Sequence, residues 1–168
     1  MSKKPVSLLK RTQSNIKSGT SKNLLTVVVK SQNQGKFHTK IKMRNHAIHS
    51  DQPFGFEGTD KGPKPSELIL AALAACQETT WRLYGESMGI QIDGISVELR
   101  GKQDLRGFIA VDKNVPAGFL EIEGEVTIES PATLKELSKL KTLVDLHCPV
   151  LDDLIRPLPV SVTLRKLD

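Results

Sequence analysis

The sequence predicts an α+β protein in which antiparallel sheets surround one long, buried helix. Residues 68–76 are all apolar or small and end in the thiol of Cys76, a composition typical of a core helix because a surface helix shows polar residues every third or fourth position. Residues 119–129 alternate between apolar and acidic side chains, which indicates a strand with one face in the core. Strand patterns precede and follow the long helix without alternating with helices, and this order separates α+β from α/β.

The length and composition indicate one globular domain. The chain has 168 residues, of which 38% are hydrophobic and 26% are charged, values typical of a folded protein with a substantial core. No apolar run is long enough to span a bilayer, and the amino terminus lacks the apolar centre of a signal peptide. We therefore expect a cytoplasmic protein without a membrane partner, divided into a basic flexible arm over 1–22 and a folded domain over 23–168.

The charge is distributed unevenly along the chain. Residues 1–50 carry eleven Lys or Arg and no acidic residue, whereas the rest of the chain carries thirteen basic and nineteen acidic residues. A basic arm can bind nucleic acid, or the basic half can pack against the acidic half of the same chain or of a partner subunit. We favour packing, because one Trp and one Tyr provide few rings for base stacking.

The first half of the chain predicts a small sheet followed by the long helix. Strands are expected at 24–30 and 36–43, with Gly35 in the turn between them, and a third strand at 44–50. Residues 51–64 are rich in Gly and Pro and predict a loop. The helix that follows is expected to run for about two dozen residues, or ~36 Å, to the vicinity of Gly89.

The second half predicts four strands and two helices. Strands are expected at 90–99 and 119–129, separated by a polar connection over 101–118 that contains a short strand at 108–111. Ser130 is expected to cap a second helix with Pro131 at its first position. The buried stripe of that helix comprises Leu134, Leu137, Leu140 and Val144. A short helix then begins at Cys148-Pro149 and ends near 155, and a closing strand is expected at 159–164.

Cys76 and Cys148 are the only two cysteines. A structural disulfide is disfavoured in a reducing compartment, so the two thiols are either inert core residues or redox residues. Cys148 lies at a helix start, where unpaired N–H groups favour a thiolate, and His147 adds positive charge when it is protonated. Cys76 lies in an apolar helix that disfavours the charged thiolate, so its reactivity requires a cation, with Arg44 and Arg82 nearest in sequence.

Other site types lack a matching pattern. Four histidines and two cysteines are potential metal ligands, but the sequence has no CxxC or HExxH spacing. It also lacks GxGxxG, P-loop and GxSxG motifs. We therefore expect neither a metal nor a bound cofactor. Glu67, one turn inside the helix entry, is a candidate acid, although a residue that complements the helix dipole is the commoner role at this position.

The segments around the two cysteines together resemble the OsmC/Ohr family, named for osmotically inducible protein C and the organic hydroperoxide resistance protein. The first segment is 65–68 followed by 71–76, and the second is His147-Cys148-Pro149-Val150. Shorter matches at 51–53, 104–107, 118–119 and 130–132 are similar to the general OsmC-like branch. The resemblance extends over roughly residues 24–165.

This resemblance implies an OsmC-like fold that forms an intertwined homodimer with active sites at the subunit interface. It also implies thiol-dependent reduction of organic hydroperoxides in defence against oxidative stress. Cys76 would attack the O–O bond and become a sulfenic acid, and Cys148 would resolve it as a disulfide. A dithiol reductant, lipoyl-type in several members, would restore both thiols by exchange.

Two accessory positions differ from the peroxidase branches of this family. There a Glu directly follows the helix-entry proline, whereas here Ser66 holds that place and Glu67 follows, about 100° around the helix. Those branches also use an Arg of the first hairpin, for which Arg44 is the best substitute. The candidate catalytic residues are therefore Cys76, Cys148, Arg44 and Glu67. The competing hypothesis is a non-enzymatic small-ligand-binding protein that keeps the fold and uses the cysteines only as core residues.

Overall fold

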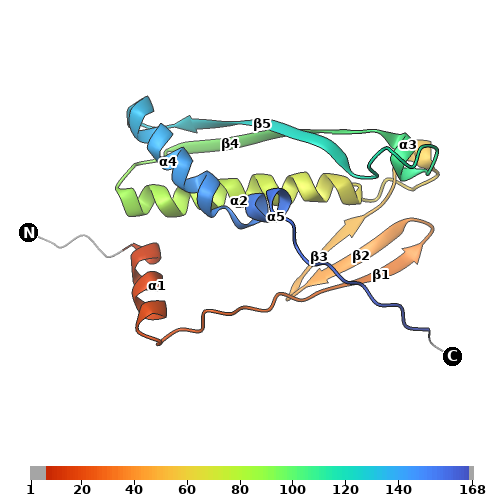
Figure 1. Cartoon of the computed structure of the whole chain (residues 1–168), viewed down its shortest axis with the longest axis horizontal. Coiled ribbons are helices and arrows are strands. Elements are labelled where there is room, and N and C mark those ends of the chain that lie inside the picture. Colours follow the sequence, from red (N-terminus) through yellow and green to blue (C-terminus); the bar gives the residue numbers. More distant parts are fainter. Residues whose placement is uncertain (1–6, 167–168) are drawn as a thin grey trace, which may run out of the picture.

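The computed structural model describes residues 7–166 and shows an α+β fold with two antiparallel sheets and a long helix (Figure 1). Strands β1, β2 and β3 form one sheet in that order, and β4 pairs with β5 in the other. The long helix α2 lies along the β4–β5 ribbon in Figure 1 and contacts β4. The elements that determine the position of the site are α2 (Pro65–Met88), α4 (Leu134–His147) and α5 (Pro149–Ile155).

The three-stranded sheet comprises β1 (Val29–Gly35), β2 (His38–Met43) and β3 (His46–Ser50). Lys36 and Arg44 adopt positive φ angles of 45° and 53° in the two turns that join these strands. The first strand was expected at 24–30, and this expectation is wrong: β1 begins five residues later, at Val29. Val29 already pairs with Met43, the last residue of β2. Residues 24–28 therefore have no strand opposite them, and without a partner an apolar segment forms no ladder.

Helix α2 begins and ends where the sequence predicts. Pro65 occupies its first turn, the Glu67 carboxylate accepts a hydrogen bond from the Lys64 backbone N–H at 2.8 Å, and Gly89 ends the helix at φ 72°. The helix was expected to be buried on every side, but only one of its faces is buried. The buried residues on that face are Leu73, Gln77, Thr80, Trp81 and Gly85. Much of the opposite face is exposed, because within the described residues the elements that contact α2, namely β4, α4, α5 and the short α1 (Leu8–Lys17), do not surround it.

The second sheet pairs β4 (Gly94–Gln103) with β5 (Phe119–Glu129). The bounds of β5 are those that its alternation predicts, with Ile122, Val126 and Ile128 half-buried beneath a row of glutamates. The expected strand at 90–99 starts four residues too early. The backbone N–H of Ile90 still bonds to the carbonyl of Gly85 at the end of α2, so pairing begins only at Gly94.

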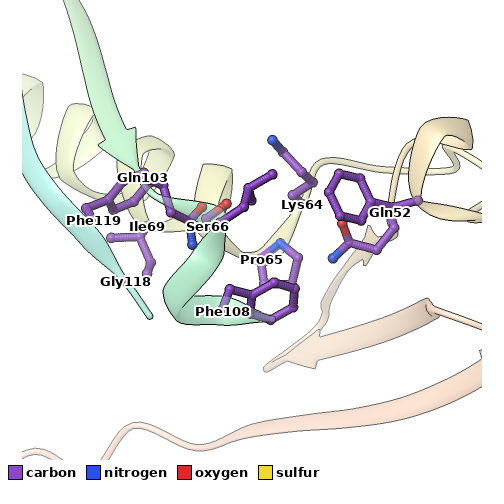
Figure 2. Close-up of a pocket in the computed structure, with 11 residues that line it drawn as sticks. Gln52, Lys64, Pro65, Ser66, Ile69, Gln103, Phe108, Gly118 and Phe119 are labelled. Carbon is purple, nitrogen blue, oxygen red and sulfur yellow. The ribbon is translucent and has the colours of Figure 1, made fainter. Parts of the chain in front are cut away.

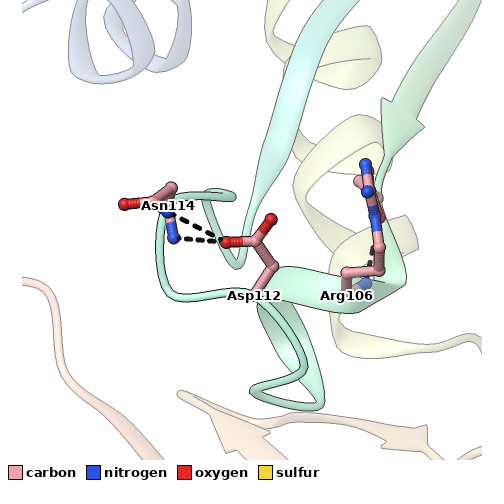
Figure 3. A network of polar contacts seen from close by, with 4 residues as sticks. Arg106, Asp112 and Asn114 are labelled. Carbon is pink, nitrogen blue, oxygen red and sulfur yellow. Dashed lines mark hydrogen bonds and ion pairs between the residues drawn. The ribbon is translucent and has the colours of Figure 1, made fainter.

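The strand expected at 108–111 is absent from the described structure, which has the short helix α3 (Leu105–Phe108) in this connection. The Asp104 carboxylate accepts a hydrogen bond from the Arg106 N–H at 3.0 Å and also pairs with its guanidinium at 2.6 Å. Local capping of this kind favours a helical turn over an extended strand. Figure 3 shows the next turn, where Asn114 donates to the Asp112 carboxylate through its backbone N–H at 3.0 Å and its side-chain amide at 3.2 Å.

Helix α4 begins three residues later than its expected first position, Pro131. Thr133, and not Ser130, is the N-cap, because Thr133 and Glu136 form a reciprocal capping box: the Glu136 N–H donates to the Thr133 hydroxyl, and the Thr133 N–H donates to the Glu136 carboxylate. Leu134 was expected to be buried but is 81% exposed. Leu140 and Val144, two turns and three turns further along, are fully buried.

The ends of the chain differ from the sequence-based expectation. Residues 159–164 form no strand, and Val160, Val162 and Leu164 are exposed, because no strand of the same chain lies beside them. Helix α1 (Leu8–Lys17), which contacts α2, occupies part of the segment expected to be a flexible arm. Residues 1–6 of that arm and the last two residues of the domain lie outside the described residues. The division of the chain at 22/23 remains a prediction.

The hydrophobic core lies where α4 crosses α2. Trp81, Leu140 and Val144 form its centre, and residues of α2, α4 and the β4–β5 sheet pack around them. Gly85 lets the Ile92 side chain pack closely on α2, because a Cβ at this position would stand only 3.0 Å from Ile92 Cδ1. Among the helices within 7–166, none combines the length and the apolarity that a bilayer crossing requires.

Asp51 is a buried carboxylate that holds the loop before α2. It is 1% exposed and accepts hydrogen bonds from the Thr59 hydroxyl and from the backbone N–H groups of Gln52, Thr59 and Lys61. These bonds, with the Thr59 hydroxyl contributing most, lower the pKa of Asp51 to about 2 against the opposing effect of burial. The loop between β3 and α2 is therefore closed around an ionised carboxylate.

We expect Leu140→Ala to lower the free energy of unfolding by about 2–5 kcal/mol, because it leaves a cavity in the core beside Trp81. Urea denaturation followed by far-UV circular dichroism measures this change. Leu134→Ala, on the exposed face of the same helix, is the matched control and should cost less than about 0.5 kcal/mol. Equal effects of the two substitutions would contradict the assignment of this core.

The depressed pKa of Asp51 predicts how acid affects stability. The carboxyl group of the unfolded chain binds a proton near pH 3.8, whereas that of the folded chain does so only near pH 2. The contribution of Asp51 is therefore fully present above about pH 4 and is lost as the pH falls towards 2. We expect the difference in urea midpoint between the wild type and Asp51→Asn to be large at pH 6 and to shrink below pH 4. A difference that stays constant from pH 6 to pH 2 would contradict this role.

Candidate functional site

The structure brings the two cysteines together. Cys76 lies on α2 and Cys148 lies at the junction of α4 and α5, 72 residues further along the chain, yet the two Sγ atoms are 3.3 Å apart. Both residues are free thiols. A disulfide needs an S–S distance of about 2 Å, so closure requires the sulfurs to approach by only about 1 Å. This is the arrangement of a pair that can cycle between dithiol and disulfide.

Local backbone structure places Cys148 against α2. Cys148 is both the C-cap of α4 and the N-cap of α5. Its backbone N–H donates to the Val144 carbonyl at 2.8 Å. Its extended backbone (φ −78°, ψ 110°) changes the direction of the chain between the helices, and Pro149 starts α5 at once. Because both α4 and α5 contact α2, the sulfur at their junction faces the Cys76 turn.

The two thiols have different environments. Cys148 is 0% exposed, whereas Cys76 is half-buried. Burial, followed by the nearby Cys76, raises the pKa of Cys148, although hydrogen bonds from the Leu151 backbone N–H and the Thr80 hydroxyl act in the opposite direction. Cys148 is therefore a neutral thiol at neutral pH, and its S–H can donate to Cys76 Sγ. Cys76 is the more exposed of the two residues.

Cys76 lies at the border between the covered and uncovered faces of α2. Thr80, one turn later, points into the core, while Ala72, Ala75 and Thr79 are exposed. A reactant can therefore reach Cys76 Sγ from the uncovered side of the helix, with Cys148 behind it. This position suits a nucleophile backed by a buried resolving thiol.

Glu67 and Arg44 do not reach the sulfurs within this chain. Glu67 is about 14 Å from Cys76 along the helix axis, and its carboxylate caps α2 and pairs with the Lys64 ammonium at 3.4 Å. Arg44 is exposed in the turn between β2 and β3. Arg82 is also exposed and donates a long hydrogen bond, 3.4 Å, to the Ile92 carbonyl. The catalytic roles of Glu67 and Arg44 remain predictions.

Sequence reasoning missed Thr80, which lies beside the cysteine pair, and Tyr84, which contacts His147. The Thr80 hydroxyl donates to the Cys76 carbonyl at 2.7 Å and acts to lower the pKa of Cys148. The rings of Tyr84 and His147 are parallel within 2° with centroids 5.2 Å apart. Helical spacing from Cys76 was the available signal, because residues four and eight positions further on lie on nearly the same side of a helix.

Two apolar cavities flank α2 on its N-terminal side. The first, about 310 Å³, opens at the helix entry between Pro65, Phe108 and Phe119, with the polar side chains of Lys64 and Ser66 among its walls (Figure 2). The second, about 430 Å³, shares Ile69 and Phe119 with the first and continues along the helix to Leu73. Neither is lined by a cysteine, although Leu73 is only one turn from Cys76.

Potential metal ligands do not gather in the part of the chain that the structure describes. No group of three or more His, Cys, Asp or Glu side chains converges within 7–166. His38 Nε2 and His49 Nδ1 lie 2.8 Å apart on neighbouring strands, remote in sequence from both cysteines.

We expect iodoacetamide to modify Cys76 well before Cys148, because Cys76 is accessible and burial keeps Cys148 protonated. Brief alkylation of the native protein at pH 8, followed by peptide mass mapping, measures the order. Alkylation after unfolding in urea is the control and should remove the difference. Equal labelling of both cysteines in the native protein would contradict the assigned environments.

Comparisons with known proteins agree with this architecture. A structure described as an OsmC-like protein from Mycoplasma pneumoniae is similar with a TM-score of 0.68 and 22% identity, over 77% of this chain and 87% of that chain. An organic hydroperoxide resistance protein OsmC from Legionella pneumophila has a TM-score of 0.61 and 18% identity, over 80% and 93% of the two chains. One from Elizabethkingia anophelis has 0.59 and 20%, over 81% and 92%.

These structural similarities, all below 25% identity, establish the fold. A search of curated protein sequences found no match. The family described as OsmC-like protein matches residues 58–163, a segment that contains both cysteines and more than half of the chain. The chain therefore belongs to the OsmC-like protein family.

Proposed function

We propose that this protein is a cysteine-based peroxidase that reduces organic hydroperoxides in defence against oxidative stress. The observation that carries the proposal is the 3.3 Å separation of two free thiols, one accessible and one fully buried. Family membership supports it, as do the similar structures whose titles describe organic hydroperoxide resistance proteins.

The proposed oxidative half-reaction has two steps. The Cys76 thiolate attacks the outer oxygen of R–OOH, the O–O bond breaks, and the alkoxide leaves and takes a proton as the alcohol. Cys148 then loses its proton and attacks the sulfenic sulfur of Cys76, the S–O bond breaks, and water leaves. The S–H of Cys148, which donates to Cys76 Sγ before the reaction, stabilises the attacking thiolate.

The proposed recycling step requires a dithiol reductant, for which a lipoyl-type dithiol is the leading candidate. Exchange with the dithiol transfers two electrons and two protons to the cysteine pair and leaves the reductant as a disulfide. The proposed setting is the cytoplasm, where such reductants are kept reduced. No metal or bound cofactor takes part in this cycle.

The proposed assembly is a homodimer. The uncovered face of α2 presents small side chains such as Ala71, Ala72 and Ala75, which permit close packing with a second copy. The apolar extended segments 24–28 and 159–164 lack partner strands and expose large hydrophobic side chains, a pattern that marks an interaction surface. A dimer also allows the β2–β3 turn of one copy to place Arg44 near Cys76 of the other.

A second candidate is a non-enzymatic small-ligand-binding protein. The two connected apolar cavities beside α2 favour it, as does the position of Arg44 and Glu67, which bond to neither sulfur in this chain. In that case the cysteines serve only to fill the core, and hydroperoxides leave them unchanged.

Treatment with stoichiometric cumene hydroperoxide tests the peroxidase proposal. We expect the wild type to lose both thiols and two hydrogen masses as an intramolecular disulfide. Cys148→Ser should accumulate sulfenic acid on Cys76, trapped with dimedone, because no resolving thiol remains. Intact mass and free-thiol counts measure these changes.

Cys76→Ser is the matched control and should keep its single thiol under the same treatment. Survival of both wild-type thiols in excess hydroperoxide would overturn the peroxidase proposal. The apolar cavities would then be tested with small apolar ligands.

A further inference from the structure

The Thr80 hydroxyl lies beside the cysteine pair, on the covered face of α2 one turn after Cys76. Thr80 is 5% exposed, and its hydroxyl donates to the Cys76 carbonyl at 2.7 Å. The same hydroxyl and the Leu151 backbone N–H both act to lower the pKa of Cys148, so the hydroxyl lies close to that second sulfur as well. A hydroxyl has only one proton to donate, so it serves one of these two acceptors at a time.

The charge on Cys148 determines which acceptor is preferred. While Cys148 is a neutral thiol, the carbonyl oxygen is the stronger acceptor, and the 2.7 Å bond shows this arrangement. A thiolate is a charged acceptor, and hydrogen bonds to charged groups are about twice as strong as neutral ones. Formation of the Cys148 thiolate therefore favours rotation of the Thr80 hydroxyl towards sulfur.

Accessibility determines which sulfur leaves when the disulfide opens. An incoming thiolate can reach Cys76, which is half-buried, but not Cys148, which is fully buried. Attack at Cys76 Sγ breaks the Cys76–Cys148 bond and places the electron pair on Cys148 Sγ. A buried thiolate is a poor leaving group unless donors stabilise it, because a leaving thiol with a lower pKa departs faster.

We propose that Thr80 is a positioning residue for the reductive half-reaction, in which its hydroxyl turns from the Cys76 carbonyl to the departing Cys148 sulfur. This inference rests on the part of the proposed function in which the cysteine pair cycles through a disulfide. The reductant thiolate bonds to Cys76 Sγ, Cys148 leaves as a thiolate and then takes a proton. The second thiol of the reductant next displaces Cys76, so that the protein recovers two thiols and the dithiol is oxidised.

The test compares Thr80→Val, which keeps the shape and removes the hydroxyl, with Thr80→Ser, which keeps the hydroxyl. Diamide, a general thiol oxidant, forms the disulfide, so that the test does not depend on hydroperoxide activity. Dithiothreitol then reduces it under stopped flow. The fluorescence of Trp81, the adjacent residue and the single Trp of the chain, reports the reaction.

We expect Thr80→Val to slow reduction by about tenfold, the effect of losing one hydrogen bond to a charged group, and Thr80→Ser to react within about twofold of the wild type. In a Cys76→Ser background, Thr80→Val should move the pH profile of the ultraviolet absorbance of the Cys148 thiolate, a readout that needs no reagent to enter the core, upward by about one unit, which is the same tenfold factor. A role limited to packing would leave that profile unchanged.

A monothiol tests the direction of attack. Brief treatment of the disulfide form with 2-mercaptoethanol, an acid quench and peptide mapping should place the mixed disulfide on Cys76. Reduction of Thr80→Val at the wild-type rate, an unchanged Cys148 profile, or a mixed disulfide on Cys148 would each overturn the inference, as would failure of diamide to form the disulfide. If hydroperoxide leaves the thiols intact while the diamide-formed disulfide still shows the Thr80 effect, the peroxidase proposal fails and this inference stands.

Discussion

The contact between α4 and α2 at Trp81, Leu140 and Val144 is the constraint on which the rest of the structure depends. Burial of these side chains holds the two helices together. Cys148 directly follows α4, one turn beyond Val144, so the position of its sulfur is set by this packing and by the change of chain direction at the α4–α5 junction. The 3.3 Å distance between the two sulfurs is thus set by hydrophobic packing and not by a covalent bond between them.

Packing also gives the two cysteines different degrees of burial. The junction places Cys148 inside the protein, where burial favours the neutral thiol, whereas the edge of the covered helix face leaves Cys76 accessible. A nucleophile needs access and a resolving thiol needs protection from other reactants, so the same asymmetry suits both proposed roles. Hydrogen bonds from Thr80 and Leu151 reduce the cost of charge on the buried sulfur. The proposed leaving role of Cys148 depends on that compensation.

The exposed face of α2 connects the fold to the proposed assembly. A helix with apolar residues on all sides is stable in water only if something covers both faces, and one chain supplies cover for one. The segments 24–28 and 159–164 are likewise apolar and uncovered, because their β-branched residues pair with no strand among the described residues. These three features were all predicted as buried or paired elements from the sequence, and all three are exposed in the single chain. A second copy that covers them would account for the sequence pattern and for the structure together.

The sequence by itself determined α2, β5 and α5, because each has strong local signals: proline at the helix entries, Gly89 at the end of α2, and strict alternation in β5. It also determined the family, through the segments around Cys76 and Cys148. Tertiary structure decided the starts of β1 and β4, since a strand begins only where a partner lies opposite, and the start of α4, where two neighbouring caps competed and the Thr133–Glu136 capping box prevailed. It alone decided which groups the Thr80 and Glu67 side chains contact, because contacts across a helix surface depend on which face is covered. Periodicity gives the angle of a residue around its helix axis, but only packing decides what that residue meets.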